Sequence, residues 1–231
     1  MPTRNVDWPQ AWRVIASRYP PINLFERLIA DPAVWDALIA LEQLTNPRVR
    51  DELGDIALVA PDERVSGPGA SYVMAAFTHI NPKGSRFSDG SFGVYYAAAT
   101  LETAIAETVF HFEAFARDAG DPARSEDMRV LVGTVAAPFE DIAALPEAEQ
   151  RALLDPDSYS ASQAYAARLR EAGANGVVYP SVRHADGQCL GVFRPRAVEL
   201  PHQERHLKYR WNGERVDRYF DYARDEWITL G

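Results

Sequence analysis

The chain has 231 residues, of which 47% are apolar, so it can bury a sizeable core as one large domain or as a domain with an appended segment. Its formal net charge of -9 disfavours nucleic acid as the main partner, because sequence-independent affinity for phosphates comes from clustered Lys and Arg. No uncharged apolar run approaches the roughly 18 residues of a membrane helix, and residues 1–20 lack the apolar region of a signal peptide, so we expect a soluble protein without a membrane partner.

The N-terminal part of the chain carries apolar residues at spacings of three and four, interrupted by the breakers "YPPIN" and "DPAVWD". This pattern predicts several short amphipathic helices. We therefore expect residues 1–65 to form a helical N-terminal extension and residues 66–231 to form the main domain, including an aromatic C-terminal tail. The apolar positions are Trp8, Trp12, Val14, Ile15, Phe25, Leu28, Ile29, Trp35, Leu38 and Leu41.

Strand-like and helix-like segments mix along the rest of the chain without the strict alternation of a doubly wound parallel sheet. We therefore expect an α+β fold with a mixed or antiparallel sheet core and flanking helices. The predicted strands are "SYVMAAFTHI", "MRVLVGTVA", "NGVVYP" and "CLGVFRP", and the predicted helical segments are "EDIAALPEAEQRALL" and "SASQAYAARLREAG".

A turn signal lies between two short strand-like runs, "GSRFS" and "FGVYYA", which predict a hairpin around Asp-Gly. A two-residue turn would put Arg86 on the same side of the sheet as Tyr95. A three-residue turn would put it on the side of Tyr96, because strand side chains alternate with period two. The sequence leaves both registers open.

Thr100 can cap the next helix, whose apolar residues form one stripe. Glu107 lies about 130° from the centre of that stripe, beside His111, so it flanks the core. Its carboxylate can project into a cleft between helix and sheet, or it can be an ordinary solvated glutamate. The stripe consists of Leu101, Ala104, Ile105, Thr108, Val109 and Phe112.

Nothing in the sequence predicts a metal or a nucleophilic cysteine. His202 and His206 in "HQERH" have helical spacing but no obvious third ligand. Cys189, the single cysteine, lies in strand-like "QCLGVF" and is best interpreted as a small buried hydrophobe. Because it can close no intrachain disulfide, we expect a cytoplasmic protein.

The run "FTHINPKGSRFSDGSFGVYYAAATLETAIAETVFH", together with "GVVYPSVR", resembles the RES-domain family, toxins of bacterial toxin–antitoxin pairs named for an Arg, a Glu and a Ser. The resemblance implies a fold like that of ADP-ribosyltransferases, a site for NAD, and cleavage of the nicotinamide–ribose bond. Carried over, the three residues are Arg86, Glu107 and Ser181, and the site tyrosine is Tyr96, with Tyr95 the nearest rival.

These residue types suit such chemistry. A carboxylate such as Glu107 stabilises an oxocarbenium-like ribose, and a guanidinium such as Arg86 matches phosphate oxygens bidentately. A tyrosine can stack on the cationic nicotinamide ring, Ser181 can donate to ribose or amide, and His79 and Arg183 can line the same cleft.

The acceptor of the ADP-ribose unit stays open in the sequence. The resemblance favours inorganic phosphate as co-substrate, which would make the protein an NAD phosphorylase. Transfer to a protein (an ADP-ribosyltransferase) is the alternative, followed by water (an NAD glycohydrolase), and a non-enzymatic binding module is less favoured. The resemblance also implies a separate helix-turn-helix antitoxin as partner, through which the acidic chain would reach an operator without binding nucleic acid directly.

Overall fold

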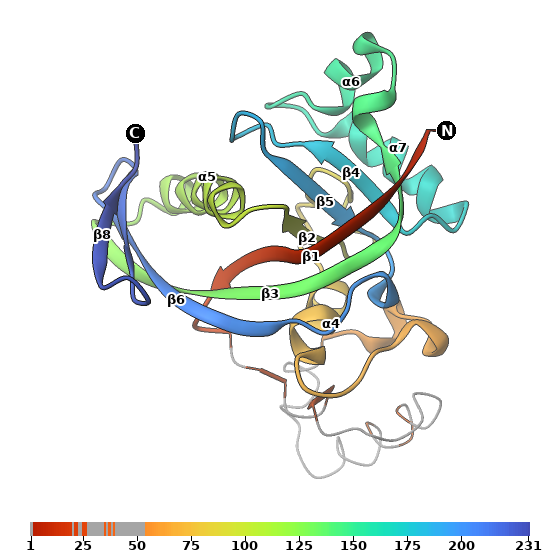
Figure 1. The fold of residues 1–231 in the computed structure, drawn as a ribbon, viewed down its shortest axis with the longest axis horizontal. Coiled ribbons are helices and arrows are strands. Elements are labelled where there is room, and N and C mark those ends of the chain that lie inside the picture. The colour runs from red at the N-terminus through yellow and green to blue at the C-terminus, as the bar shows by residue number, and fades with distance from the viewer. Residues whose placement is uncertain are drawn as a thin grey trace.

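The computed structural model describes residues 2–19, 21–22, 25–26, 35, 37, 39 and 54–231. Within them an eight-stranded mixed sheet is combined with helices, which confirms the predicted α+β class (Figure 1). The strands are β1 (Thr3–Ala16), β2 (Tyr95–Ala98), β3 (Arg124–Asp141), β4 (Gly176–Pro180), β5 (Gln188–Val192), β6 (His202–Trp211), β7 (Val216–Asp221) and β8 (Glu226–Thr229). The α-helices are α4 (Ala70–Thr78), α5 (Leu101–Ala119), α6 (Glu147–Leu153) and α7 (Ser160–Glu171), and short 3-10 turns occupy Ile56–Leu58, Pro61–Glu63, Ile142–Ala144 and Pro195–Ala197.

The order of strands in the sheet is β1-β2-β5-β4-β3-β6-β7-β8, and β1 also pairs with β3. The pairings from β1 through β2, β5, β4 and β3 therefore return to β1 and close a ring of five strands. Strands β3 and β4 pair in parallel, while the other pairs are antiparallel. Strands β6 to β8 continue outward from β3 as a C-terminal extension of the sheet.

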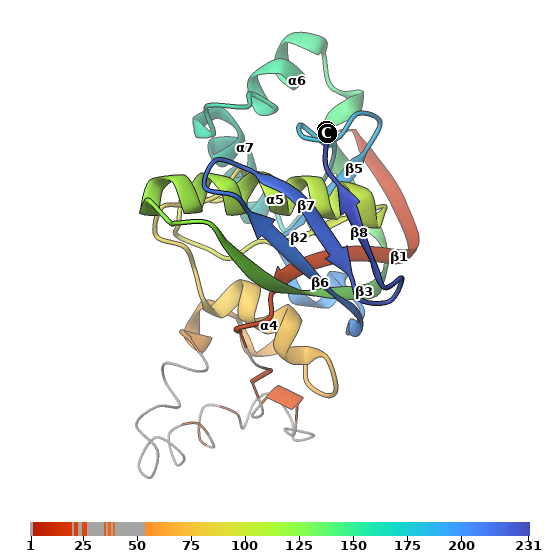
Figure 2. The same ribbon diagram turned by 90° about the vertical axis from the view of Figure 1, so that its left-hand side faces the viewer.

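Two apolar cores lie on opposite sides of the long strands, where α5 and α4 pack (Figures 1 and 2). The first core takes Ile105 from α5, and the second takes Met74 from α4. Neighbouring residues of β2 serve different cores: Tyr95 is buried in the second, while Tyr96 packs against the first. The alternation of strand side chains thus decides which tyrosine can reach which side.

Residues 3–16 form strand β1 and not the helix predicted from their spacing. Pro9 lies where the register of β1 against β3 shifts between Trp8 and Ala11. A bulge tolerates a residue without an N–H. Residues Leu28, Ile29, Leu38 and Leu41 lie outside the described residues, and Phe25 and Trp35 are helical and buried. The division of the chain at residue 65 stays a prediction, although β1 is an integral strand of the sheet.

Helix α4 replaces the strand predicted for "SYVMAAFTHI". The buried residues Ala70, Val73, Met74 and Phe77 have the helical spacing i, i+3, i+4 and i+7, which aligns them along one face. The predicted hairpin is also wrong. The run "GSRFS" forms a tight turn with an isolated bridge between Ser85 and Ser88, and only the second run supplies a strand, β2.

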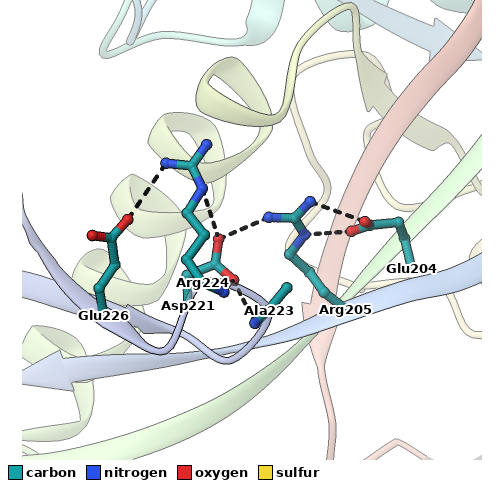
Figure 3. A network of polar contacts seen from close by, with 6 residues as sticks. All are labelled: Glu204, Arg205, Asp221, Ala223, Arg224 and Glu226. Atoms are coloured by element: carbon teal, nitrogen blue, oxygen red, sulfur yellow. Dashed lines mark hydrogen bonds and ion pairs between the residues drawn. The ribbon is translucent and has the colours of Figure 1, made fainter.

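The aromatic tail forms strands β6 to β8, which the sequence analysis did not assign. Figure 3 shows Asp221 of β7 between Arg205 of β6 and Arg224 of the following turn. The Asp221 carboxylate is buried and accepts from Arg205 Nη1 at 2.8 Å and from the backbone N–H of Ala223 at 2.9 Å. These bonds fix the β7–β8 turn against β6. In the part of the chain that the structure describes, no helix is long and apolar enough to cross a membrane.

Candidate active site

A cavity of about 180 Å³ opens between β1, β2 and α5 on the side of the first core. Arg86, Tyr96 and Glu107, which sequence reasoning proposed together, all line it. Ser181 contacts Glu107 directly, while Tyr95 is buried in the second core and His79 lines a different cavity. The other lining residues are Trp12, Arg13, Val14, Ser85, Ala97, Ala98, Ala104, Thr108, His111, Tyr159, Tyr179, Arg183 and Cys189.

Glu107 reaches this cavity from the second turn of α5. Thr100 begins the helix as predicted, since its hydroxyl accepts from the Thr103 N–H at 3.2 Å. The half-buried Glu107 carboxylate accepts a hydrogen bond from Ser181 Oγ at 2.6 Å. It makes no ion pair among the described residues, so its negative charge faces the cavity without being neutralised.

Ser181 is held as a donor to that carboxylate. Its oxygen accepts from the backbone N–H groups of Arg183 at 3.1 Å and His184 at 3.0 Å. Its own N–H donates to the carbonyl of Gly187 at 2.8 Å, which closes the β4–β5 connection. A serine hydroxyl has one proton, and here that proton is directed to Glu107. The hydroxyl therefore orients the carboxylate.

Arg86 is buried in the turn that precedes β2. Its Nη1 donates to the carbonyl of Asp155 at 2.8 Å and to that of Leu153 at 3.4 Å. Its guanidinium lies 4.5 Å from the ring centroid of Tyr159. The described residues offer it no carboxylate within ion-pair distance. A buried positive charge without a counter-ion, lining a cavity, is the environment expected of an anion-binding arginine.

Tyr96 braces the Arg86 turn. Its hydroxyl is 2.8 Å from Ser85 Oγ and accepts from the Phe87 N–H at 3.0 Å, so it holds the residues on either side of Arg86. Burial raises the pKa of Tyr96 to about 12, against the hydrogen bonds from Ser85 and Phe87. The phenol therefore stays protonated at neutral pH. The ring lines the cavity, and the hydroxyl is used by the fold.

Arg183 was expected to line this cleft and does so, whereas the sequence assigned no role to Tyr159 or His111. Tyr159 and Arg183 close the cavity, the latter 3.4 Å from the Phe110 ring centroid and donating to the Pro156 carbonyl at 2.9 Å. Desolvation lowers the pKa of His111, partly exposed at the rim, while Glu107 opposes this. Of Tyr159 and His111, only His111 had a signal in the sequence, its spacing of four from Glu107.

Cys189 lies beside the carboxylate, with its Sγ 3.8 Å from Glu107 Oε1. Burial raises the pKa of the thiol, and the charge of Glu107 raises it further. The protonated thiol is a poor nucleophile, which agrees with its interpretation as a buried hydrophobe. Among the described residues no group of three His, Cys, Asp or Glu side chains could hold a metal ion. His202 and His206 lie on strand β6 and not on a helix.

Comparison with known proteins gives this geometry a family. A family model described as the RES domain matches residues 62–212. The chain belongs to the RES-domain family. The match includes Arg86, Tyr96, Glu107 and Ser181, together with α4 and α5. It begins after β1, which adds Arg13 to the cavity, and it ends before β7.

This RES-domain chain is similar to two known proteins to different degrees. An uncharacterized protein, y4oC, of Sinorhizobium fredii (strain NBRC 101917 / NGR234) is 30% identical over 208 residues, which are 89% of this chain and 84% of that protein. A chain in the crystal structure of the M. tuberculosis MbcT-MbcA toxin-antitoxin complex is 12% identical, with a TM-score of 0.44, and the alignment covers 90% of this chain and 87% of that one.

Proposed function

We propose that this RES domain is a toxin that cleaves the nicotinamide–ribose bond of NAD. The observation that carries the proposal is the Glu107 carboxylate, which makes no ion pair among the described residues, is oriented by Ser181 at 2.6 Å and shares a small cavity with Arg86. A fixed negative charge in a partly enclosed cavity stabilises positive charge that develops during a reaction. The ribose C1′ of NAD develops such charge as nicotinamide leaves.

The bond breaks heterolytically. Both electrons of the C1′–N bond go to the pyridinium nitrogen, so nicotinamide leaves as a neutral molecule and needs no general acid. An acceptor oxygen then forms the new bond to C1′. An ionised phosphate oxygen has no proton to lose, whereas water would release one to solvent. Glu107 stabilises the oxocarbenium-like ribose or binds its hydroxyls. The first cavity, at about 180 Å³, is smaller than the roughly 300–1,000 Å³ that is typical for ligands of drug size. It would therefore hold only the nicotinamide end of the substrate.

Arg86 and Tyr96 would hold the substrate around that centre. Nη1 of Arg86 already donates to two backbone carbonyls. The other N–H groups of the guanidinium would therefore bind the phosphate on the nicotinamide side. The Tyr96 ring lines the cavity where nicotinamide would lie. Tyr95 is buried in the second core, and His79 lines the neighbouring cavity, so neither contacts the reacting bond in this arrangement.

Inorganic phosphate is the acceptor that we propose, which would make the protein an NAD phosphorylase. Incubating the purified chain with NAD, with and without phosphate, tests this through the products. ADP-ribose phosphate formed only with phosphate supports the proposal. Free ADP-ribose would identify water as acceptor, and ADP-ribose bound to a protein would identify an ADP-ribosyltransferase.

An enzyme that consumes NAD in the cytoplasm, the compartment that we propose, needs an inhibitor. We infer a separate helix-turn-helix antitoxin that binds the chain as protein and blocks or covers the NAD site. The membership in the RES-domain family supports this partner. Co-expression with the product of the neighbouring gene, followed by purification of the complex, tests it.

The two adjacent tyrosines give a matched pair of variants. Tyr96→Phe removes the hydroxyl that braces Ser85 and Phe87, and we expect turnover of NAD to fall about tenfold, as for the loss of one or more hydrogen bonds. Tyr95→Phe should leave turnover unchanged, because none of the described residues forms a hydrogen bond with that hydroxyl. Steady-state kinetics on both variants provides the check. Equal turnover of NAD by the two variants would mean that the hydrogen bonds of the Tyr96 hydroxyl are unimportant.

Ser181 is expected to act through Glu107. Ser181→Ala should lower kcat about 10- to 100-fold with a smaller change in KM, because a hydrogen bond to a charged group is lost and the carboxylate is no longer oriented. Ser181→Thr retains a hydroxyl and should restore most of the activity. A Ser181→Ala protein with the wild-type kcat would contradict this positioning role.

A further inference from the structure

A second cavity, of about 920 Å³, lies beside the candidate active site. It is bounded by α4 and by the C-terminal end of β1. Arg13, Ser85 and Tyr96 line both cavities, so the two share a wall. The first cavity, at about 180 Å³, is much smaller. A dinucleotide that placed one end beside Glu107 would need further space for its other end, and this is the neighbouring space.

We propose that the second cavity binds the adenosine half of NAD, an inference that rests on the proposed function. Its volume lies within the range of about 300–1,000 Å³ in which protein pockets enclose ligands of drug size. NAD then extends from Glu107, past the shared wall, to α4. The residues that line only the second cavity take no part in breaking the bond. Its contribution is affinity for the part of the substrate that does not react.

Arg13 stands at the shared wall, where the pyrophosphate of such a ligand would pass. Its Nη1 donates to the Tyr96 carbonyl at 2.8 Å, and its guanidinium lies 4.6 Å from the ring centroid of Tyr95. Its Nε is buried and has no hydrogen-bond partner. Within the described residues no acid pairs with it. An unneutralised guanidinium with a donor to spare suits a phosphate oxygen.

Two tyrosines supply faces on which a base can stack. Tyr19 lines the second cavity and is 58% exposed, and Tyr72 lines it from α4. Arg129 Nη1 donates to the Tyr72 hydroxyl at 3.2 Å and to the Tyr19 carbonyl at 3.3 Å, so one side chain holds both residues in place. Ala75 and Ala76 also line this cavity, and their small side chains leave its volume open. Aromatic side chains bind bases of any identity by stacking.

Binding of ADP to the purified chain, measured by titration calorimetry, tests the inference without any turnover. Tyr19→Ala removes an exposed ring, and Ala76→Phe fills the cavity from a helix position that is only half-buried, so at least one variant should fold. We expect each to weaken the affinity for ADP by about tenfold or more. The control is Phe115→Ala, which removes an aromatic side chain that is 57% exposed and lies in neither cavity.

Different results contradict different claims. If the wild-type chain does not bind ADP, or if both folded variants bind it as tightly as the wild type, the adenosine site is elsewhere and the inference fails. If the variants weaken ADP binding but the wild-type chain does not release nicotinamide from NAD, the second cavity stands as a nucleotide site and the proposed function fails.

Discussion

Replacing Glu107 by glutamine is expected to lower the rate of nicotinamide release from NAD by about 100- to 1,000-fold, the usual cost of losing one electrostatic contact to a transition state. The amide has nearly the shape of the carboxylate. Its oxygen can still accept the hydrogen bond from Ser181 Oγ, which lies 2.6 Å from Glu107 Oε1 in the wild-type chain. What it lacks is the negative charge that we propose lies next to C1′. Steady-state kinetics on the purified variant measures the loss, which should appear mainly in kcat.

The matched control for this variant is Glu102→Gln. Glu102 lies on the same helix, α5, but is exposed and lines neither cavity. Its replacement should leave turnover unchanged and cost little thermal stability, because Glu102 only adds a favourable charge to the first turn of α5. If Glu107→Gln releases nicotinamide as fast as the wild-type chain does, then the carboxylate does not stabilise the reacting ribose and the assignment of the site is wrong.

Arg86→Lys is expected to lower kcat/KM for NAD by about 100-fold, although the charge is kept. A lysine cannot donate to the backbone carbonyl of Asp155 and also present a planar fork to a phosphate, and it stacks less well on Tyr159. The KM for NAD should rise strongly, whereas the melting temperature should change little.

Arg168→Lys is the control, because Arg168 is exposed and also lies near an aromatic ring, 5.9 Å from the centroid of Tyr165. It should behave as the wild type. An Arg86→Lys protein with wild-type kinetics but lower stability would show that Arg86 supports the fold and does not bind phosphate.

Local sequence signals predicted the central elements well. Thr100 begins α5, and the apolar stripe behind it packs on the sheet as its helical spacing requires. The segments predicted around β3, β4, β5 and α7 are present because each combines one period of hydrophobicity with a clear boundary. The predictions of a helix at β1 and of a strand at α4 were wrong. Both segments contain apolar spacings that fit either a helix or a strand, and contacts with residues far along the chain decided which one forms.

The candidate site was partly predictable for a similar reason. Helical spacing indicated that Glu107 lies at the edge of the core, but not that Ser181 would hold it. Tyr96 was one of two alternatives that the turn left open, and the hairpin on which both registers depended is absent. It faces the cavity because β2 pairs with β5, which places Tyr96 opposite Gly191. Tyr159 carries no local signal, since only the packing of α7 brings it to Arg86.

The most direct test of this account is the release of nicotinamide when the purified, folded wild-type chain is incubated with NAD and phosphate. The account predicts sustained release with loss of NAD, at a rate that the Glu107→Gln variant cannot reach. Intact NAD after prolonged incubation, both with and without phosphate, would contradict the proposed cleavage and leave the cavity as a binding site only.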